Sequence, residues 1–276
     1  QWTGPNKERV TVRPLLSHAS GLPSWRPLYK EATSPEAARA LVLATNLDTL
    51  PGVRFVYSDL NFILLGMLAE RVTGQPLERL VVERVTAPVG MPDTRFRPEA
   101  AERARIAPTE YDPWRQRQIR GEVHDENAFA LGGVAGHAGL FSTAADLSRL
   151  ARTLLAGGVS PDGRRVFRAE TLAEFTRAQD TTVSRRALGW ETPTGGNSAG
   201  HALTARAFGH TGFTGTSLWM DPVRGVYVLL LTNRVNPTRT NTRIGGVRVA
   251  LADSVLRALG AEVTFPPRAA AAPRAP

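Results

Sequence analysis

The sequence predicts an α+β fold, in which helices dominate the first two thirds of the chain and an antiparallel sheet flanked by helices follows. Up to about residue 180 the apolar residues recur at intervals of three and four, the spacing of amphipathic helices. From residue 181 to 266 short runs of branched and aromatic residues are separated by Pro, Gly and Asp, which is typical of strands and turns. We therefore expect a mostly helical region at 1–180, a sheet with a C-terminal helix at 181–266, and a disordered tail at 267–276.

Composition excludes several classes of protein. The chain has 276 residues, 42% of them hydrophobic, which is enough for a packed core. Its longest apolar runs, such as 226–232, are much shorter than the roughly 20 residues that a membrane-spanning helix needs. There is no cysteine, so disulfides and thiolate chemistry are excluded. The net charge of +9 comes from arginines spread along the chain without a dense run, so we expect no nucleic-acid partner.

Capping residues mark the first two helices. Thr11 can cap a short helix over 12–17. Ser34 stands before Pro35, and a cap followed by proline in the first turn predicts a helix that runs to about Ala44.

The next two helices follow a short extended piece at 55–57. From Asp59 onward the apolar residues recur at three and four, which predicts a helix that Gly74 ends. Pro76 then lies in the first turn of another helix, which we expect to end near Gly90.

The middle of the chain alternates irregular and helical segments. Residues 95–127 are charged and irregular, and predict a long surface excursion that rims a site. Residues 132–136 form a glycine-rich turn, after which Thr143 can cap a helix. A further helix is expected near 170–178.

The last third of the chain predicts a sheet covered by a helix. Strands are expected at 188–190, 213–220 and 226–232, and the turn at 221–225 should join the last two as a hairpin. The helical pattern at 243–259 should cover one face of this sheet.

Tyr57 is the first candidate for chemistry. It stands directly before a helix start, where two rigid elements can hold its phenol in place. A tyrosine beside an ammonium group loses its proton more readily, and can then act as a base toward a serine hydroxyl. Taken alone, Tyr57 also fits a half-buried tyrosine at the start of a helix, and Asp59 fits a helix N-cap.

The second candidate is His210-Thr211-Gly212, which precedes Phe213 on a predicted edge strand. Glycine at 212 leaves room for a substrate, so the N–H of Phe213 could point outward as an oxyanion donor. The same residues also fit a turn beside a hydrogen-bonded histidine. We expect the side chains of Tyr57 and His210 to face each other across one pocket.

Several ordered motifs resemble a known family. They are Thr11–Pro23, Pro51–Asp59, Val72–Gly74, Pro88–Met91, Gly136–Thr143 and Gly209–Gly215. In this order they resemble the class C β-lactamase-like serine hydrolases, which include penicillin-binding proteins, D-alanyl-D-alanine carboxypeptidases and esterases. The resemblance covers about residues 10–260, and segment 121–137 is most similar to the penicillin-binding protein 4B-like carboxypeptidases.

The resemblance implies a β-lactamase/transpeptidase-like fold and an acyl-enzyme mechanism. In that mechanism the serine of a Ser-x-x-Lys motif attacks the carbonyl of a D-amino-acid peptide, an ester or a β-lactam. The expected partner is therefore a small molecule or a peptide, such as one derived from peptidoglycan. The resemblance further implies a periplasmic, secreted or cell-envelope location, and no cofactor.

The resemblance also assigns roles to residues. Tyr57 is implied to be the base, Asp59 takes the place of an asparagine, and His210-Thr211-Gly212 matches a Lys-Thr-Gly box. Phe213-Thr214 and His137 are implied to bind the substrate or its oxyanion. Ionised Asp59 only accepts hydrogen bonds, so it could pair with the motif lysine instead of a substrate amide. His210 is mostly neutral near pH 7, so we expect weak capture of a substrate carboxylate and weak β-lactam hydrolysis.

The nucleophile motif is not in this sequence. The only lysines are Lys7 and Lys30, and the residues three places before them are Gly4 and Pro27. In the family, Ser-x-x-Lys lies upstream of the region that matches Thr11, together with the first strands of the sheet. We therefore expect a truncated portion of a longer hydrolase, inactive as it stands because the nucleophile helix is missing.

Two other functions fit parts of the sequence. A pseudoenzyme that binds peptidoglycan or another ligand would keep the binding site and perform no chemistry. A metal hydrolase could use His124-Asp125-Glu126 with His137, His201 and His210. No two of these histidines have the i, i+4 helical spacing of a zinc pair, so we expect no metal.

Overall fold

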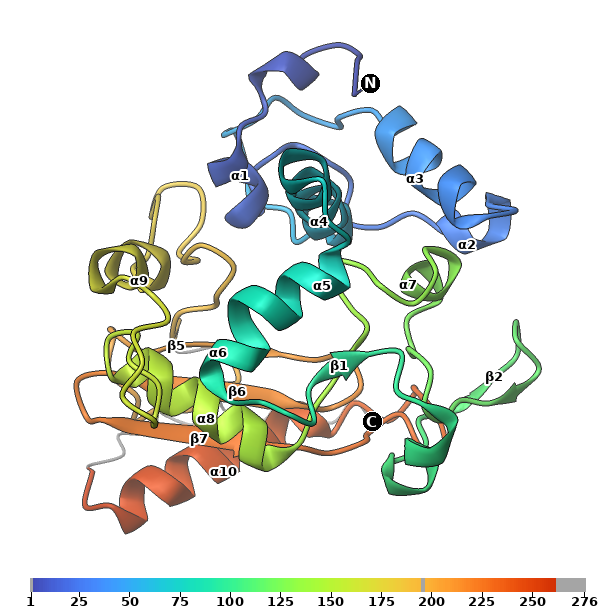
Figure 1. Ribbon diagram of the computed structural model, residues 1–276. Helices are drawn as coiled ribbons and strands as arrows, with labels where there is room; N and C mark the ends of the chain where they lie inside the picture. The colour runs from blue at the N-terminus through green and yellow to red at the C-terminus, as the bar shows by residue number, and fades with distance from the viewer. Residues whose placement is uncertain (1, 195–196, 262–276) are drawn as a thin grey trace, which may run out of the picture.

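The computed structural model describes residues 2–194 and 197–261, which form a mixed α+β arrangement (Figure 1). The helices are α1 (Val12–Leu16), α2 (Leu28–Glu31), α3 (Pro35–Ala44), α4 (Asp59–Thr73), α5 (Leu77–Val81), α6 (Ala87–Val89), α7 (Glu126–Ala130), α8 (Ala144–Leu155), α9 (Ala169–Thr176) and α10 (Ile244–Ala258). Short 3₁₀ segments lie at η1 (Lys7–Arg9) and η3 (Ala100–Arg105), and a π-helical segment at η2 (Val82–Thr86). The strands are β1 (Arg95–Phe96), β2 (Tyr111–Asp112), β3 (Arg117–Gln118), β4 (Leu140–Phe141), β5 (Phe208–Thr211), β6 (Ser217–Asp221) and β7 (Val226–Leu230).

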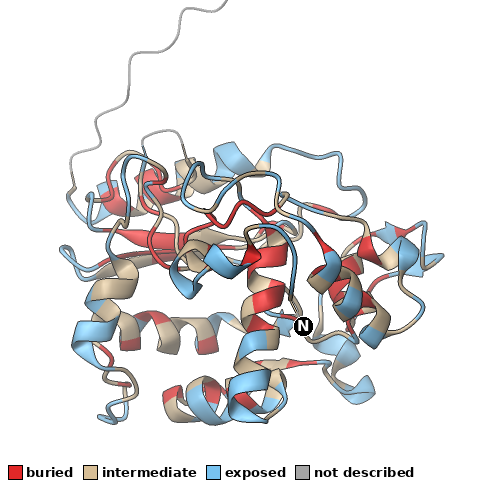
Figure 2. Cartoon of the chain, turned by 90° about the horizontal axis from the view of Figure 1, so that it is seen from above, coloured by how far each residue is buried: buried red, intermediate tan, exposed pale blue. Residues whose placement is uncertain are grey.

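The helical part packs around α4. This helix buries Leu60, Ile63 and Leu64 in a cluster that α1, α3 and α7 complete. Gly74 ends α4 in the left-handed conformation, with φ of 68°, and its N–H bonds to the carbonyl of Glu70 at 2.8 Å. Figure 2 shows buried residues gathered on the inner sides of the helices and along the sheet.

The sheet has the antiparallel order β5-β6-β7 and a helix on each face. Successive residues of a strand point to opposite faces, so neighbouring Trp219 and Met220 enter two different cores. Trp219 packs with Leu256 of α10, whereas Met220 packs with Ala151 of α8. Figure 1 shows the three strands between these two helices. The hairpin expected at 221–225 is confirmed by the register of β6 with β7.

Several sequence predictions about local structure are confirmed. The Ser34 hydroxyl caps α3 by accepting the Ala37 N–H at 3.1 Å, and Thr143 caps α8 in the same way. The helices expected near 170–178 and 243–259 are α9 and α10. No helix in the described part of the chain is long and apolar enough to cross a membrane.

Other predictions were wrong in detail. Residues 188–189 form a bend and Trp190 has no regular structure, while Glu191 makes an isolated bridge to Gly209. The strand expected at 213–220 begins at Ser217, because the Gly212 N–H bonds to the Thr216 carbonyl and closes a turn.

The excursion at 95–127 is not wholly a surface segment. It buries Ile119 and Val123, together with the carboxylates of Glu110 and Asp112, which arginines neutralise. The helix expected from 76 to 90 is three consecutive segments, α5, η2 and α6. The predicted tail at 267–276 lies outside the described residues.

Candidate functional site

The fold brings Tyr57 and His210 together. Tyr57 ends the extended segment before α4, and His210 lies on β5, an edge strand of the described sheet. Their ring centroids are 6.1 Å apart, with an angle of 37° between the ring planes. The expected proximity of the two side chains is confirmed, although 153 positions separate them, and the pocket expected between them stays a prediction.

His18 holds the segment that carries Tyr57. The imidazole is almost fully buried, and its Nδ1 accepts the N–H of Ser58 at 3.1 Å. The carbonyl of His18 accepts the N–H of Val56 at 2.9 Å, and its ring lies 4.4 Å from that of Tyr57. Burial, reinforced by the positive charge of Arg186, lowers the pKa of His18 to about 3. Our reading of the sequence gave His18 no role, because its partners lie about 40 positions away.

The phenol of Tyr57 is held in its protonated form. Loss of water around the hydroxyl, and then the negative charge of Asp59, raise the pKa of Tyr57 to about 12, even though 45% of the residue is exposed. Arg186 opposes this shift, because its guanidinium lies 5.4 Å from the centre of the Tyr57 ring. An additional positive charge would therefore be needed for Tyr57 to act as a base near neutral pH.

Arg186 is the positive charge that the structure places here. Its side chain is 12% exposed, and Nη1 lies 3.4 Å from a carboxylate oxygen of Glu191. The other guanidinium nitrogens, Nε and Nη2, are buried and have no hydrogen-bond partner among the described residues. Burial, followed by the charge of Arg186, lowers the pKa of His210 and so favours its neutral form.

Replacing Arg186 by glutamine should therefore raise the pKa of His210. The guanidinium repels a protonated imidazole, whereas Glu191, which would remain, attracts one. The measurement is an NMR titration of the His210 ring protons in the purified chain. Arg186→Lys should largely preserve the low pKa, and Glu191→Gln should lower it further. A pKa of His210 that does not change in Arg186→Gln would contradict this account.

A tight turn follows β5 and carries the rest of the predicted box. A Cβ at Gly212 would come too close to the hydroxyl of Thr216, so a larger residue here would force that side chain to rotate. Arg248 of α10 fixes the turn by donating from Nη2 to the carbonyls of Gly212 and Thr216, both at 2.7 Å.

Phe213, next in the turn, is 59% exposed, and its ring stacks against His124 and the guanidinium of Arg234. The carbonyl of Thr214 accepts the Arg234 N–H at 2.8 Å. The proposed contacts of Thr211, Phe213 and Thr214 with an oxyanion or substrate stay predictions.

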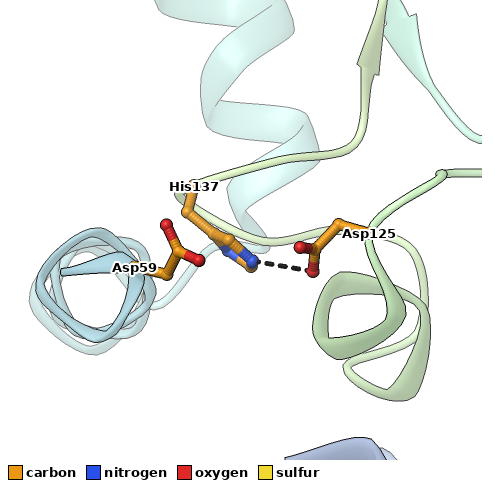
Figure 3. A group of neighbouring side chains, drawn as sticks. All are labelled: Asp59, Asp125 and His137. Carbon is orange, nitrogen blue, oxygen red and sulfur yellow. Dashed lines mark hydrogen bonds and ion pairs between the residues drawn. The ribbon is translucent and has the colours of Figure 1, made fainter. Parts of the chain in front are cut away.

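Asp59 lies in a second cluster, with Asp125 and His137 (Figure 3). Asp125 caps α7, and its Oδ1 accepts the Ala128 N–H at 2.7 Å and contacts His137 Nε2 at 3.0 Å. Burial would raise the pKa of Asp125, but the hydrogen bonds from His137 and Ala128 outweigh it and lower the pKa. Burial raises the pKa of Asp59, the neighbouring His137 opposes this rise, and the charge of Asp125 adds to it.

The other histidines of the imagined metal hydrolase do not meet. His124 Nε2 contacts Glu110 at 2.7 Å, and His201 Nδ1 contacts Asp253 at 2.7 Å. Of the residues considered for the metal hydrolase, Asp125 and His137 lie close together, and Asp59 lies beside them. The sequence assigns Asp125 a role only in the metal alternative, apart from its place in the segment 121–137 that carries the resemblance, although its position directly before α7 is a capping signal.

Comparison with known proteins gives consistent results. A family model described as Beta-lactamase matches residues 1–252. An Escherichia coli K12 protein named "Putative D-alanyl-D-alanine carboxypeptidase" is 35% identical over 259 aligned residues, which cover 83% of this chain and 58% of that protein. A protein of the same name from Salmonella schwarzengrund is 31% identical, with coverage of 86% and 60%. The chain thus spans less than two thirds of the length of these relatives.

Solved structures share the fold. A penicillin-binding protein homologue from Caulobacter crescentus superposes with a TM-score of 0.65 at 22% identity, covering 92% of this chain and 73% of that one. A β-lactamase from Mycobacterium bovis gives 0.63 at 23% identity, with coverage of 92% and 75%. EstCE1, a hydrolase with promiscuous acyltransferase activity, gives 0.64 at 21% identity, with coverage of 88% and 72%. The predicted β-lactamase/transpeptidase-like architecture is confirmed by these likenesses.

Proposed function

The chain belongs to the beta-lactamase family, and from this premise we propose that it carries the proton-transfer and substrate-binding part of a D-alanyl-D-alanine carboxypeptidase-like serine hydrolase. The pairing of Tyr57 with His210 is the observation that supports this proposal most directly. The names of the Escherichia coli and Salmonella relatives support the choice of a D-alanyl peptide as substrate.

In the proposed reaction the charge of the lysine in the Ser-x-x-Lys motif lowers the pKa of Tyr57, and the phenolate takes the proton of a serine hydroxyl as that serine attacks the peptide carbonyl. The phenol returns the proton to the leaving amine, and a water molecule then hydrolyses the acyl-enzyme. A neutral His210 holds the place of a lysine without its charge, and Arg186 adds positive charge beside Tyr57. The attacking serine belongs to a Ser-x-x-Lys motif that residues 1–276 do not contain.

Covalent labelling tests this proposal. The chain alone should not react with a fluorophosphonate probe, because no serine in it has a lysine three positions later. A version extended at its N-terminus by the native upstream sequence should be labelled, and a D-alanyl-D-alanine peptide should slow the labelling. Binding of peptidoglycan fragments by the extended version without any labelling would favour the non-catalytic receptor instead.

A further inference from the structure

We infer that Asp59, Asp125 and His137 form a binding site for one divalent transition-metal ion of the zinc type. The three residues lie 66 and 12 positions apart in the sequence and come from the start of α4, the cap of α7 and the loop before β4. One ligand atom from each residue lies within 4.8 Å of the other two. Figure 3 shows the imidazole between the two carboxylates.

Each of the three residues keeps an unused acceptor. The carboxylate of Asp59 receives no hydrogen bond within the described part of the chain, and Oδ2 of Asp125 likewise has no donor. Nδ1 of His137 is buried without a partner, on a side chain that is only 6% exposed. Within residues 2–194 and 197–261, no lysine or arginine forms an ion pair with Asp59 or Asp125. Buried acceptors and like charges that face one another are costly unless a cation lies between them.

The chemistry of these acceptors favours a transition metal over other cations. Calcium and magnesium prefer sites built from oxygen alone, whereas an imidazole nitrogen with two carboxylates suits zinc or manganese. Nδ1 of His137 is closed to solvent, so a bare ion can reach it more readily than an ammonium group on a substrate.

The spacing is also suitable for a metal. Ligand atoms of a tetrahedral ion with bonds of about 2.1 Å lie roughly 3.4 Å apart. One ligand atom of each residue lies within 4.8 Å of the others, and the 3.0 Å contact of Asp125 Oδ1 with His137 Nε2 would open as the ring turns Nδ1 toward the ion. The sequence led us to expect no metal because the histidines lack helical pair spacing, and a site assembled from three distant segments leaves no such signal.

The test is a metal titration of the purified chain after treatment with a chelator. Isothermal calorimetry with ZnCl₂ and MnCl₂ should show one strong site, and gel filtration should leave one zinc ion per chain. Asp59→Asn, Asp125→Asn and His137→Gln should each weaken zinc binding by roughly tenfold or more. His201→Gln removes a histidine that is paired with Asp253 outside this cluster, so it should leave the affinity unchanged.

Asp59→Asn is the most informative of these variants, because its carboxylate accepts no hydrogen bond from the described residues and the chain should still fold. Zinc should raise the melting temperature of the wild-type chain and not that of Asp59→Asn. Absence of stoichiometric zinc or manganese in the wild-type chain would overturn the inference. Unchanged affinity in all three variants would also overturn it, as would binding of methylammonium without binding of either metal.

Discussion

Replacing Tyr57 by phenylalanine should slow acylation of the N-terminally extended protein by roughly 10²- to 10⁴-fold, the usual contribution of a general base. Phenylalanine keeps the ring that packs against His18 and His210 and removes only the hydroxyl. The fold should therefore be preserved while proton transfer is lost. The rate of fluorophosphonate labelling measures this effect without any assumption about the natural substrate.

Tyr111→Phe is the matched control for this prediction. Tyr111 lies on β2, is 56% exposed and makes no ring contact with Tyr57 or His210. Its loss should leave the labelling rate unchanged. If Tyr57→Phe slowed labelling less than tenfold, another group would have to be the base.

Lowering the pH from 7 to 5 should cost the folded chain about 2 kcal/mol through His18 alone. The pKa of His18 is about 3 in the folded chain, against an ordinary value of 6.5. Between these values the unfolded chain takes up a proton that the folded chain does not. The stabilisation is therefore present in full above pH 6.5, falls as the pH decreases, and is lost by about pH 3. Urea unfolding followed by tryptophan fluorescence at several pH values measures the change.

His18→Asn separates this effect from other titrating groups. The asparagine oxygen can accept the Ser58 N–H as Nδ1 does, and asparagine tolerates the positive φ of 57° at this position. The variant should be less stable at pH 7, since it loses the ring contacts, but its stability should depend less on pH. His201→Asn, which keeps His18, should retain the dependence. A His18→Asn variant with the wild-type pH dependence would refute the assignment.

The parts of the fold that could be predicted from the sequence are those with local causes. The capping of α3 by Ser34, the end of α4 at Gly74 and the hairpin at 221–225 each depend on residues within a few positions of one another. The sequence predicts a strand at 213–220, whereas residues 213–216 belong to a turn. This turn is held by the backbone hydrogen bond from the Gly212 N–H to the Thr216 carbonyl and by the two hydrogen bonds from Arg248. The local sequence pattern does not indicate these bonds.

The candidate site divides in the same way. Tyr57 and His210 could be named because each lies in a recognisable motif. Arg186 could not be named from the sequence, because its position beside the Tyr57 ring depends on the path of the chain before β5. The partnership of Asp59 with Asp125 and His137 likewise depends on three segments that meet only in the folded chain.

The two hydrogen bonds from Arg248 connect α10 to the turn between β5 and β6. Through these bonds α10 supports the turn that carries Phe213, although most of the helix packs against one face of the sheet. Truncating the protein before Arg248 would remove this donor and leave the two carbonyls with only their backbone donors, the N–H groups of Gly215 and Gly212. Helix α10 therefore contributes to the rigidity of a turn that lies 32 to 36 positions earlier in the sequence.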